Sequence, residues 1–600
     1  MTPAWWCAVW SAAAWFGALL ATPLPLWAGP AAVLAGWRLP VRAPAVALGM
    51  LLLASSLGAR AHDGLDPPRR EPFDGEVTLV GDPRWVGPSL RVDVRADGRR
   101  VEAWARGDAA AVLAPRLAGE RVELRGRLAP APADAPWLVA RHVAARLSVV
   151  EAGPWRAGDP ASRAANAVRR TIARGAEVLG ADRRSLYLGL LLGDQRDQDV
   201  VTADDFAGSG LTHLLAVSGS NVAVLMALLG PLLLRMRFGR RLALSLGVLA
   251  FFALVTRFEP SVLRATAMAG SAAAAVTFGL EAGSRRLLPI AVIGLVLVDP
   301  LLVHSLGFRL SVAATGGIAL LGAPLARHLP GPTWIREPLA VTVAAQAAVA
   351  PLLIPTFGGI PVASLPANLL AGPATGPVVL WGIPAGLVAG VAPSLAGLVH
   401  LPTGLLVGWV GGVARWSAAL PVGEVRWRHV VVAGAGALVV AVSASSGRRA
   451  VGWSVVVAAL AHPAVVLATA GDRTSDLTPS ATAHVVGRCV VVEVSSGIRA
   501  DDLLEGLRRA GVTRVDVVVA HDGGRDVAEA VAALSRRSPP RLVLAPEGHR
   551  VPRASTPPVG AEVSVGTLVI RVESVRPRLE TTLRVRGARD VARGARGPPR

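Results

Sequence analysis

The 600-residue sequence contains no lysine and only two cysteines. All 62 basic residues are therefore arginines, which excludes the Gly-x-x-x-x-Gly-Lys-Ser/Thr loop that binds nucleoside triphosphates. Cys7 and Cys489 are too few for a disulfide framework or a cysteine-based zinc site. The first residues lack the basic region of a cleaved signal peptide, so we do not expect a signal peptide here. Any ATP-driven work has to come from a partner.

The composition is that of a membrane protein. Hydrophobic residues make up 52% of the chain, and the mean hydropathy is +0.48, which exceeds what ordinary soluble domains show. The formal net charge is +20, from 62 basic and 42 acidic residues. A basic balance of this size favours phosphate-bearing partners, either lipid headgroups or nucleic acid.

The N-terminal quarter of the chain changes character twice. Residues 1–60 predict N-terminal transmembrane helices, because stretches near 4–21 and 43–59 approach the roughly 20 residues that cross a bilayer. Residues 61–155 alternate apolar and polar positions in five short runs, the last of them "WLVARHVAA", which predicts a small antiparallel β-domain of five strands. An OB-like barrel and another small β-domain fit this pattern equally well. Residues 156–207 predict a connector that contains an amphipathic helix lying on a surface.

Residues 208–470 are dominated by apolar runs, and the length rule predicts roughly ten membrane spans there. The candidate spans lie near residues 213–234, 242–257, 261–280, 287–303, 307–325, 338–357, 362–390, 395–420, 429–444 and 451–470. Several are interrupted by Pro and Gly, as in "APLLIPTFGGIPVASLPANLLAGP". Broken helices persist at membrane depth only where protein or a water-filled cavity satisfies the freed backbone groups. This pattern favours a conduit over a simple anchor.

Residues 471–600 return to a soluble character. Runs such as "HVVGRCVVVEV" and "VTRVDVVVAHDGG" predict buried strands, with helices between them, in an α/β or α+β domain. The final stretch, "VRGARDVARGARGPPR", is a basic tail.

The arginines between spans predict the orientation. Arginines lie between the first and second candidate spans of residues 208–470, and again between the third and fourth. Loops rich in arginine are usually cytoplasmic. The arginines are Arg235, Arg237, Arg240, Arg241, Arg285 and Arg286. Arg448 and Arg449 precede the last span. Counting spans from these loops predicts a multi-pass plasma-membrane protein with both soluble domains on the external face.

Four ordered segments resemble the ComEC family of competence proteins, the inner-membrane DNA channel of natural transformation. They are "LGLLLGDQRD…FAGSGLTHLLAVSGSNVAVL", "EPSVLRATAMAG", "VDPLLVHSLGFRLSVAATGGI" and "QAAVAPLLIPTFGGIPVASLPANLLAGP". The resemblance implies a polytopic α-helical integral membrane protein with an external OB-like β-barrel domain and a C-terminal metallo-β-lactamase-like α/β domain. The family usually has a Gly-Leu-His-type triplet where this chain has Gly219-Ser220-Asn221.

The same resemblance implies transport of single-stranded transforming DNA across the plasma membrane during natural competence. Its implied partners are single-stranded DNA, the lipid bilayer, a cytoplasmic helicase-type motor and an external DNA receptor. No cofactor is predicted, and no pattern in the sequence indicates an oligomeric state.

The C-terminal domain departs from the metal-dependent members of the family. Those members carry a His-x-His-x-Asp-His run, because a two-metal site needs several converging ligands. Only His521 and Asp522 remain of these ligands here. We therefore expect a degenerate, metal-free domain without enzymatic activity. The alternatives are a membrane-bound nuclease that degrades the strand not imported, and a small-solute transporter, although no inverted repeat is evident.

Polar side chains inside apolar spans are candidates for lining the DNA path. Arg264 leads them because a guanidinium fits phosphate oxygens, although an arginine that reaches lipid headgroups is nearly as good an explanation. The full set for the path is His213, Ser218, Gly219, Asn221, Glu259, Arg264, Arg309, Ser311, Gln346 and Asn368. Trp85, Trp104 and Trp137 are candidate stacking residues for single-stranded DNA, with core tryptophans as the favoured alternative.

Overall fold

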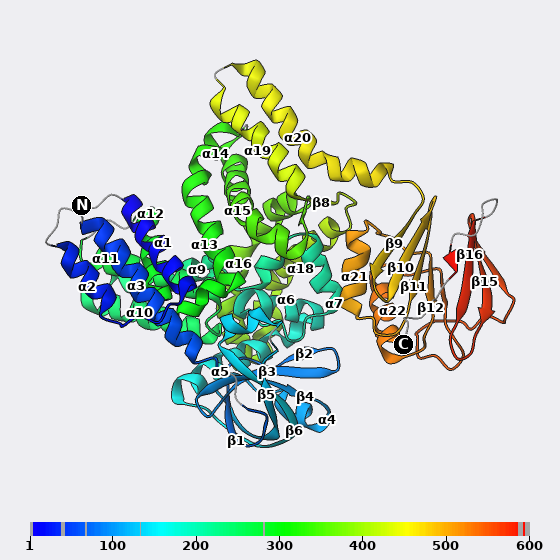
Figure 1. The fold of residues 1–600 in the computed structure, drawn as a ribbon, viewed down its shortest axis with the longest axis horizontal. Helices are drawn as coiled ribbons and strands as arrows, with labels where there is room; N and C mark the ends of the chain where they lie inside the picture. Colours follow the sequence, from blue (N-terminus) through cyan, green and yellow to red (C-terminus); the bar gives the residue numbers. More distant parts are fainter. Residues whose placement is uncertain are drawn as a thin grey trace. The chain divides into compact units, whose positions relative to one another are not determined.

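A computed structural model describes residues 4–37, 42–66, 69–132, 134–279, 283–329, 331–443, 445–585 and 592–593. The chain divides into two compact units, whose elements are labelled in Figure 1. The first comprises Met1–Asp197, His213–Leu352 and Gly372–Val410, and the second comprises Gln198–Thr212, Leu353–Ala371 and Gly411–Arg600. Each unit is therefore assembled from segments that lie far apart in the sequence. The predicted basic tail falls almost entirely outside the described residues.

The first unit begins with three apolar helices: α1 (Ala4–Leu20), α2 (Ala28–Trp37) and α3 (Arg42–Asp63). Small residues let α1 and α3 approach closely, since a Cβ added to Gly58 would lie only 2.9 Å from the carbonyl oxygen of Ala18. The hydroxyls of Thr22 and Ser55 also lie 2.6 Å apart. Close backbone approach and interhelical hydrogen bonds are how apolar helices associate in lipid.

Six strands of the first unit form a sheet that closes on itself. They are β1 (Glu71–Leu79), β2 (Arg84–Val86), β3 (Ser89–Ala96), β4 (Arg99–Ala105), β5 (Arg121–Pro130) and β6 (Val143–Arg156). The order across the sheet is β1-β5-β6-β4-β3-β2, and β1 also pairs with β3, which closes the ring. β4 runs parallel to β6. Alternate apolar side chains of the strands fill the interior together with helix α4 (Gly107–Leu113).

Two details of this sheet differ from the five strands expected from the sequence. β2 is an additional short strand, so the sheet has six. The run "WLVARHVAA" was expected to be one strand, but Pro136–Arg141 is a 3-10 helix (η1) and β6 begins at Val143. Proline favours the first position of a helix because its missing N–H would have no partner there.

Helix α5 (Pro160–Gly175) follows the sheet, and η2 (Ala176–Leu179) and α6 (Ala181–Leu192) come next. The expectation that α5 lies on a surface with its arginines outward is wrong for Arg169, which is 3% exposed. Its buried face packs closely on α16, because a Cβ added to Gly390 would lie 2.6 Å from Thr171 Cγ2. Helix α5 therefore carries arginines on two faces and is packed against other elements of the unit.

The remaining helices of the first unit are apolar. They include α9 (Gly219–Leu234), α10 (Phe238–Val255), α11 (Pro260–Thr277), α12 (Ser284–Val298), η3 (Pro300–His304), α13 (Leu306–Gly317), η4 (Ile318–Gly322), α14 (Ala323–His328), η5 (Pro393–Leu395) and α17 (Ala396–Val399). Four more helices have residues in both units: α8 (Thr212–Leu215), α15 (Thr333–Phe357), α16 (Ser364–Val391) and α18 (Leu401–Ala418).

Six helices of the described chain are long and apolar enough to cross a membrane, or seven if one bent pair counts as a single span. The six are Arg42–Asp63, Phe238–Val255, Leu306–His328, Thr333–Phe357, Ser364–Val391 and Ser446–Thr469, and the bent pair is Pro393–Val399 with Leu401–Ala418. Within residues 208–470, five of these helices, or six with the bent pair, meet this measure. The roughly ten spans expected there are more, because that count includes α9 and α19, with 16 residues each, and α12, with 15. The number of spans nevertheless identifies a polytopic membrane protein.

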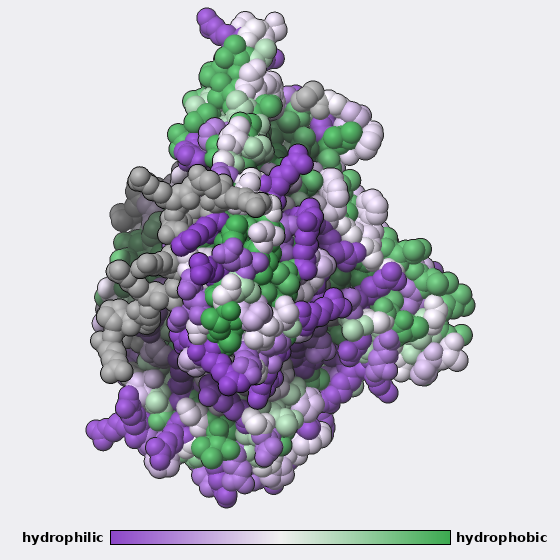
Figure 2. Space-filling model, turned by 90° about the vertical axis from the view of Figure 1, so that its right-hand side faces the viewer, coloured by the Kyte–Doolittle hydropathy of each residue, from purple (hydrophilic) through white to green (hydrophobic). Residues whose placement is uncertain are grey.

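The second unit contains α7 (Val200–Gly208), α19 (Trp427–Val442) and α20 (Ser446–Thr469). It also contains the predicted break after α15, where β7 (Ile360–Pro361) pairs with β8 (Glu424–Val425) before α16 begins. By contrast, Pro373 at the end of the same stretch stays inside α16, as do Pro377 and Pro384 beyond it. Apolar side chains cover the α19–α20 pair at the top of Figure 2, and those exposed include Val431, Leu438, Val442, Val451, Val457 and Val465.

The C-terminal part of the second unit has two sheets and two helices, as the α/β pattern predicts. The first sheet has the order β13-β12-β11-β10-β9, and the second has the order β14-β15-β16-β17. The strands are β9 (Arg473–Thr478), β10 (Ala481–Val486), β11 (Cys489–Val494), β12 (Val517–Ala520), β13 (Leu542–Leu544), β14 (Glu562–Val565), β15 (Leu568–Ser574), β16 (Glu580–Val585) and β17 (Ala592–Arg593). Helices α21 (Ala500–Arg509) and α22 (Arg525–Arg537) cover one face of the first sheet, and the second sheet packs on its other face.

Candidate nucleic-acid path and interface

The polar stretch Ser218-Gly219-Ser220-Asn221 interrupts the apolar sequence where α9 begins, and each of its polar side chains makes a hydrogen bond. Ser218 is the N-cap residue of α9, in extended backbone conformation with φ −101° and ψ 167°. Its hydroxyl lies 2.5 Å from that of Ser220 and donates to Asn221 Oδ1 at 3.1 Å. Asn221 is 5% exposed, and its Nδ2 donates to the carbonyl of Leu190 in α6 at 2.9 Å. Interruptions of this kind, with their polar groups hydrogen-bonded, occur within membrane proteins where neighbouring helices shield them from lipid.

Arg264 of α11 is buried beside this break, with 8% of its surface exposed. Its Nε donates to Ser311 Oγ of α13 at 2.7 Å, and its Nη1 lies 3.2 Å from Met268 Sδ. A hydroxyl and a thioether carry no charge, so these contacts do not compensate the positive charge of Arg264, and no ion pair within the described residues does so. Burying such a charge is costly in a protein interior.

The first turn of α9 lies against the Arg264 guanidinium. A Cβ added to Gly219 would lie 2.9 Å from Arg264 Nη2, so only glycine leaves the guanidinium its present position. The N-terminus of a helix carries unpaired N–H groups and a partial positive charge. Ser218, Gly219, Arg264 and Ser311, four of the candidates taken from the sequence, therefore meet at one electropositive position inside the first unit.

A buried ion-pair network joins the closed sheet to the helices of the same unit. Arg169 of α5 donates through Nη2 to Asp82, which follows β1, at 2.9 Å, and to Asp194, which follows α6, at 3.0 Å. Arg257, between α10 and α11, lies 2.9 Å from Asp82 and donates to Asn166 Oδ1 at 2.8 Å. The network therefore fixes the sheet, α5 and the α10–α11 turn relative to one another.

The carboxylates of this network are held in the charged form. Burial acts to raise the pKa of Asp82, but the charges of Arg169 and Arg257 outweigh it and leave the pKa below its usual value. Burial likewise opposes ionisation of Asp194, yet hydrogen bonds and charge from Arg196, at 2.6 Å, lower the pKa of that carboxyl far below its usual range. Both carboxylates are therefore negatively charged at neutral pH.

The other path candidates do not gather around Arg264. Glu259 precedes α11 as its N-cap residue, and burial raises the pKa of its carboxyl. Arg309 is exposed on α13, and His213 is exposed on α8. Gln346 is half-buried on α15, whereas Asn368 lies in the second unit, where its Nδ2 donates to a carbonyl of its own helix at 2.7 Å.

The three candidate stacking tryptophans are not core residues of the sheet. Trp85 on β2 is 52% exposed and Trp137 on η1 is 56% exposed, so the alternative of core tryptophans is wrong for both. Trp104 on β4 is half-buried, and its Nε1 donates to Glu102 at 2.9 Å.

His521 and Asp522 follow β12 and are occupied by protein partners. His521 Nδ1 lies 2.6 Å from the carbonyl oxygen of Leu579, and its Nε2 lies 3.6 Å from Glu493. Burial acts to raise the pKa of Glu493, but hydrogen bonds from His484 and His521 lower it to about 2. Asp522 accepts a hydrogen bond from a backbone N–H at 2.8 Å and pairs with an arginine at 3.0 Å. Within the described residues, no group of three or more His, Cys, Asp or Glu side chains is arranged to hold a metal ion.

Acidic residues of α7 pair with arginines of the C-terminal helices in the second unit. Arg508 of α21 lies 3.2 Å from Asp204, and Arg537 of α22 lies 2.6 Å from Asp204 and 2.8 Å from Asp205. Burial is the main cause that raises the pKa of Asp205 to about 6, and the neighbouring Asp204 adds to it against the opposing charge of Arg537.

Sequence reasoning missed Asp82, Arg169 and Arg257 as partners. The three residues lie in separate segments that are spread over 175 positions. No periodicity or motif links them, so only the fold brings them together. Asp194 and Arg196 were quoted within "LGDQRD", but the pattern gave no indication of their partners.

Comparison with known proteins finds similarity over the central part of the chain. The family model described as "Competence protein" matches residues 190–446. Over 200 residues the chain is 29% identical to ComE operon protein 3 of Bacillus subtilis (strain 168), and this match covers 33% of the chain and 25% of that relative. No solved structure matches the chain. The α8–α9 break, Arg264 and Ser311 therefore lie within the residues 190–446 that are similar to competence proteins.

Proposed function

We propose that this protein conducts single-stranded transforming DNA across the plasma membrane during natural competence. The observation that carries the proposal is the uncompensated charge of Arg264 at the N-terminal end of α9, inside the competence-family segment. Guanidinium groups and helix N-termini are both favourable surroundings for phosphate. A strand that passes this position would supply the negative charge that Ser311 and Met268 do not.

The closed sheet is proposed to be an OB-like receiving domain for the strand. Without the short β2, its circular order β1-β5-β6-β4-β3 is a five-stranded barrel with α4 inserted between β4 and β5. OB folds bind oligonucleotides through the loops after their first and fourth strands. Trp85 stands in the first of these connections and Trp137 in the other, and both side chains are exposed. Stacking on such side chains tolerates any base sequence.

The C-terminal part is proposed to be a degenerate metallo-β-lactamase-like domain, so that the protein is a channel without enzymatic activity. Two packed sheets with helices on one outer face support the fold assignment. His521 and Asp522 already contact Leu579 and Arg578, which supports a structural role for them. The competing proposal, a nuclease acting on the strand not imported, requires a bound metal pair. One or more zinc or manganese ions per purified full-length chain would favour the nuclease.

The orientation and partners follow from the proposed transport. The arginines around Arg240 and Arg285 support a cytoplasmic position for both loops. The proposal counts the apolar helices α9, α11, α12 and α19 as spans as well, and this count would put both soluble parts on the external face. Because the sequence has no lysine, no Gly-x-x-x-x-Gly-Lys-Ser/Thr loop is possible and the strand would be pulled by a cytoplasmic helicase-type motor. An external DNA receptor would deliver it to the OB-like domain.

A transformation assay with labelled DNA tests the proposal. A transformable host that lacks its own ComEC-type protein is supplied with this chain, and nuclease-resistant label is measured in the cytoplasm. We expect import to depend on the chain. Cells that gain no import from the expressed, membrane-inserted protein would contradict the proposed function.

A further inference from the structure

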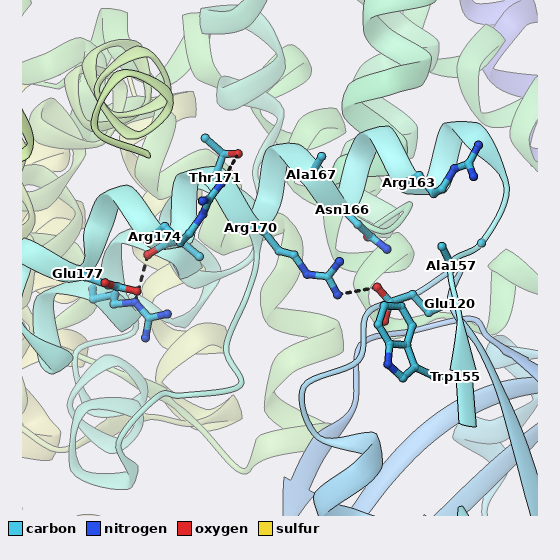
Figure 3. A pocket seen from close by; sticks show the side chains of 13 residues that line it. Glu120, Trp155, Ala157, Arg163, Asn166, Ala167, Arg170, Thr171, Arg174 and Glu177 are labelled. Carbon is cyan, nitrogen blue, oxygen red and sulfur yellow. Dashed lines mark hydrogen bonds and ion pairs between the residues drawn. The ribbon is translucent and has the colours of Figure 1, made fainter. Parts of the chain in front are cut away.

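A cavity of about 600 Å³ lies between the end of β6 and helix α5, apart from the connections that carry Trp85 and Trp137. Figure 3 shows Arg170 reaching from α5 to Glu120, beside the indole ring of Trp155. The lining side chains include four arginines and two glutamates, which leaves two formal positive charges: Arg163, Arg170, Arg174, Arg184, Glu120 and Glu177. We call this cavity the α5 groove.

The arginines of the α5 groove share one helix face. Arg163, Ala167, Arg170 and Arg174 stand at positions i, i+4, i+7 and i+11, which lie on the same side of an α-helix. Ala167 is exposed, so the space between the arginines stays open. The first and last arginines of this row are about 16 Å apart along the helix axis at the usual rise per residue. A row of this length suits an extended anionic chain better than a single ion.

Two of these four arginines, Arg163 and Arg174, form no ion pair within the described residues, whereas the other two do. Arg170 pairs with the buried Glu120 at 2.5 Å. Arg174 makes one long hydrogen bond to the Thr171 hydroxyl at 3.4 Å. Arg184 donates to the carbonyl of Ala173 at 3.3 Å and lies 3.5 Å from an exposed aspartate. Contacts this long leave N–H groups available to a further acceptor.

Trp155 forms a flat apolar wall beside this basic row. It is 43% exposed, and the guanidinium carbon of Arg116 lies 4.3 Å from the centre of its ring. A cation on one face of an indole holds the ring in place and leaves the other face for stacking. Stacking platforms beside a basic groove are the features with which proteins bind single strands without sequence preference.

The helix that carries the row is held rigidly. Arg169, on another face of the helix, and Asn166, in the lining of the groove, belong to the buried ion-pair network, and the helix packs on α16 at Gly386 and Gly390. A groove on such a support keeps its shape when a ligand binds, which lowers the entropy cost of binding.

We propose that the α5 groove is a binding site for single-stranded nucleic acid, with Trp155 stacking on a base and Arg163 and Arg174 holding phosphates. The inference rests on the proposed transport and adds a second contact site, distinct from the OB-type loops. The acyl chain of a lipid would fill the cavity without a planar aromatic side chain. The indole ring of Trp155 therefore favours a nucleic-acid base over an anionic lipid as the ligand.

The test uses the full-length protein in nanodiscs of neutral phosphatidylcholine. Binding of a fluorescein-labelled twelve-residue oligothymidine is measured by anisotropy at several salt concentrations. We expect Arg163→Gln/Arg174→Gln to weaken binding about tenfold and to reduce the slope of log K against log salt by about 1.4, the value for two lost phosphate contacts. Trp155→Leu should weaken binding by about five- to tenfold. The matched control is Arg127→Gln, an exposed arginine on β5.

A second measurement locates the contact. The photo-crosslinker p-benzoylphenylalanine is placed at Ala167, inside the groove, or at Val150, which is 78% exposed on β6 outside it. We expect crosslinks to the oligonucleotide from Ala167 and few from Val150. This readout does not depend on the stability of the arginine variants.

The outcomes separate this inference from the proposed function. If the wild-type protein neither binds the oligonucleotide nor imports DNA, the proposed function fails and the groove assignment fails with it. If the wild-type protein does both, but the groove variants bind like Arg127→Gln and Ala167 gives no crosslink, only the groove assignment is overturned. Loss of binding to phosphatidylglycerol vesicles with unchanged oligonucleotide binding would also overturn it, in favour of a lipid headgroup site.

Discussion

Asp82 connects the closed sheet to the helices of the first unit, and its replacement by asparagine has a predictable cost. The carboxylate is 8% exposed and accepts hydrogen bonds from Arg169 at 2.9 Å and from the backbone N–H of Ala118 at 2.8 Å. Arg257 lies 2.9 Å from it on another side. Asparagine keeps the shape but removes the charge that compensates two buried guanidinium groups.

The loss of stability in Asp82→Asn depends on which partners Arg169 and Arg257 keep. Arg169 keeps Asp194 as an ion-pair partner, whereas Arg257 keeps only the neutral Asn166. Removing one partner of a buried ion pair usually costs about 3–5 kcal/mol, because an uncompensated charge is left inside. We therefore expect Asp82→Asn to lower the free energy of unfolding by about 3–5 kcal/mol.

The pH dependence gives an independent check. Burial acts to raise the pKa of Asp82, but Arg169 and Arg257 lower it below the usual 3.8. A carboxyl with a lowered pKa contributes stability above its unfolded value, and this stability is lost as the pH falls through the folded value. The wild-type protein should therefore lose stability below about pH 4 more steeply than Asp82→Asn does.

Unfolding in detergent, followed by tryptophan fluorescence at pH 7 and in acid, measures both effects. The matched control is Asp74→Asn, whose partner Arg125 is 64% exposed. An exposed pair contributes only about 0–1 kcal/mol, so the control should be nearly neutral. If Asp82→Asn is no less stable than Asp74→Asn, the network does not hold the sheet to the helices.

Further predictions concern other parts of the chain. The pKa of Asp205 is raised to about 6, mainly by burial, so wild-type stability should fall as the pH rises from about 4 to 6, and Asp205→Asn should flatten this fall in a pH series of unfolding measurements. Gly219→Ala should displace the Arg264 guanidinium and reduce DNA import while leaving the unfolding temperature nearly unchanged, and unchanged import would count against their contact. Trp85→Leu/Trp137→Leu should weaken oligothymidine binding by roughly tenfold or more, and equal affinity would remove both from the interface.

The sequence predicted the classes of structure well, because periodicity reports burial directly. Alternation over residues 71–105 gives β1, β3 and β4, and the apolar runs give the membrane helices. Trp137 was placed in a strand but lies in a 3-10 helix, since Pro136 before it favours a helical turn over a ladder position. The predicted span count exceeds the number of helices that meet the length and composition criterion, because α12 and α9 have only 15 and 16 residues.

Residues of the candidate site could be predicted only where their type is unusual among the neighbouring residues, as a charged residue is in an apolar run. Arg264 stands out in an apolar run, and the structure places it against Gly219 and Ser311, which were also named. Asp82 and Trp155 have unremarkable neighbours in the sequence, so their roles depend on long-range packing. A buried arginine network leaves no local pattern, because its members are contributed one at a time by separate elements.

Import of labelled DNA by cells that express Arg264→Gln tests the account most directly. The comparison strains carry the wild-type chain, Arg264→Lys, and Arg240→Gln, which changes an exposed arginine at the start of α10. With equal amounts of protein in the membrane, the account predicts that Arg264→Gln loses most of the nuclease-resistant label, that Arg264→Lys retains part of it, and that Arg240→Gln imports like the wild type. Wild-type import by Arg264→Gln would contradict the claim that the charge of Arg264 serves the passing strand.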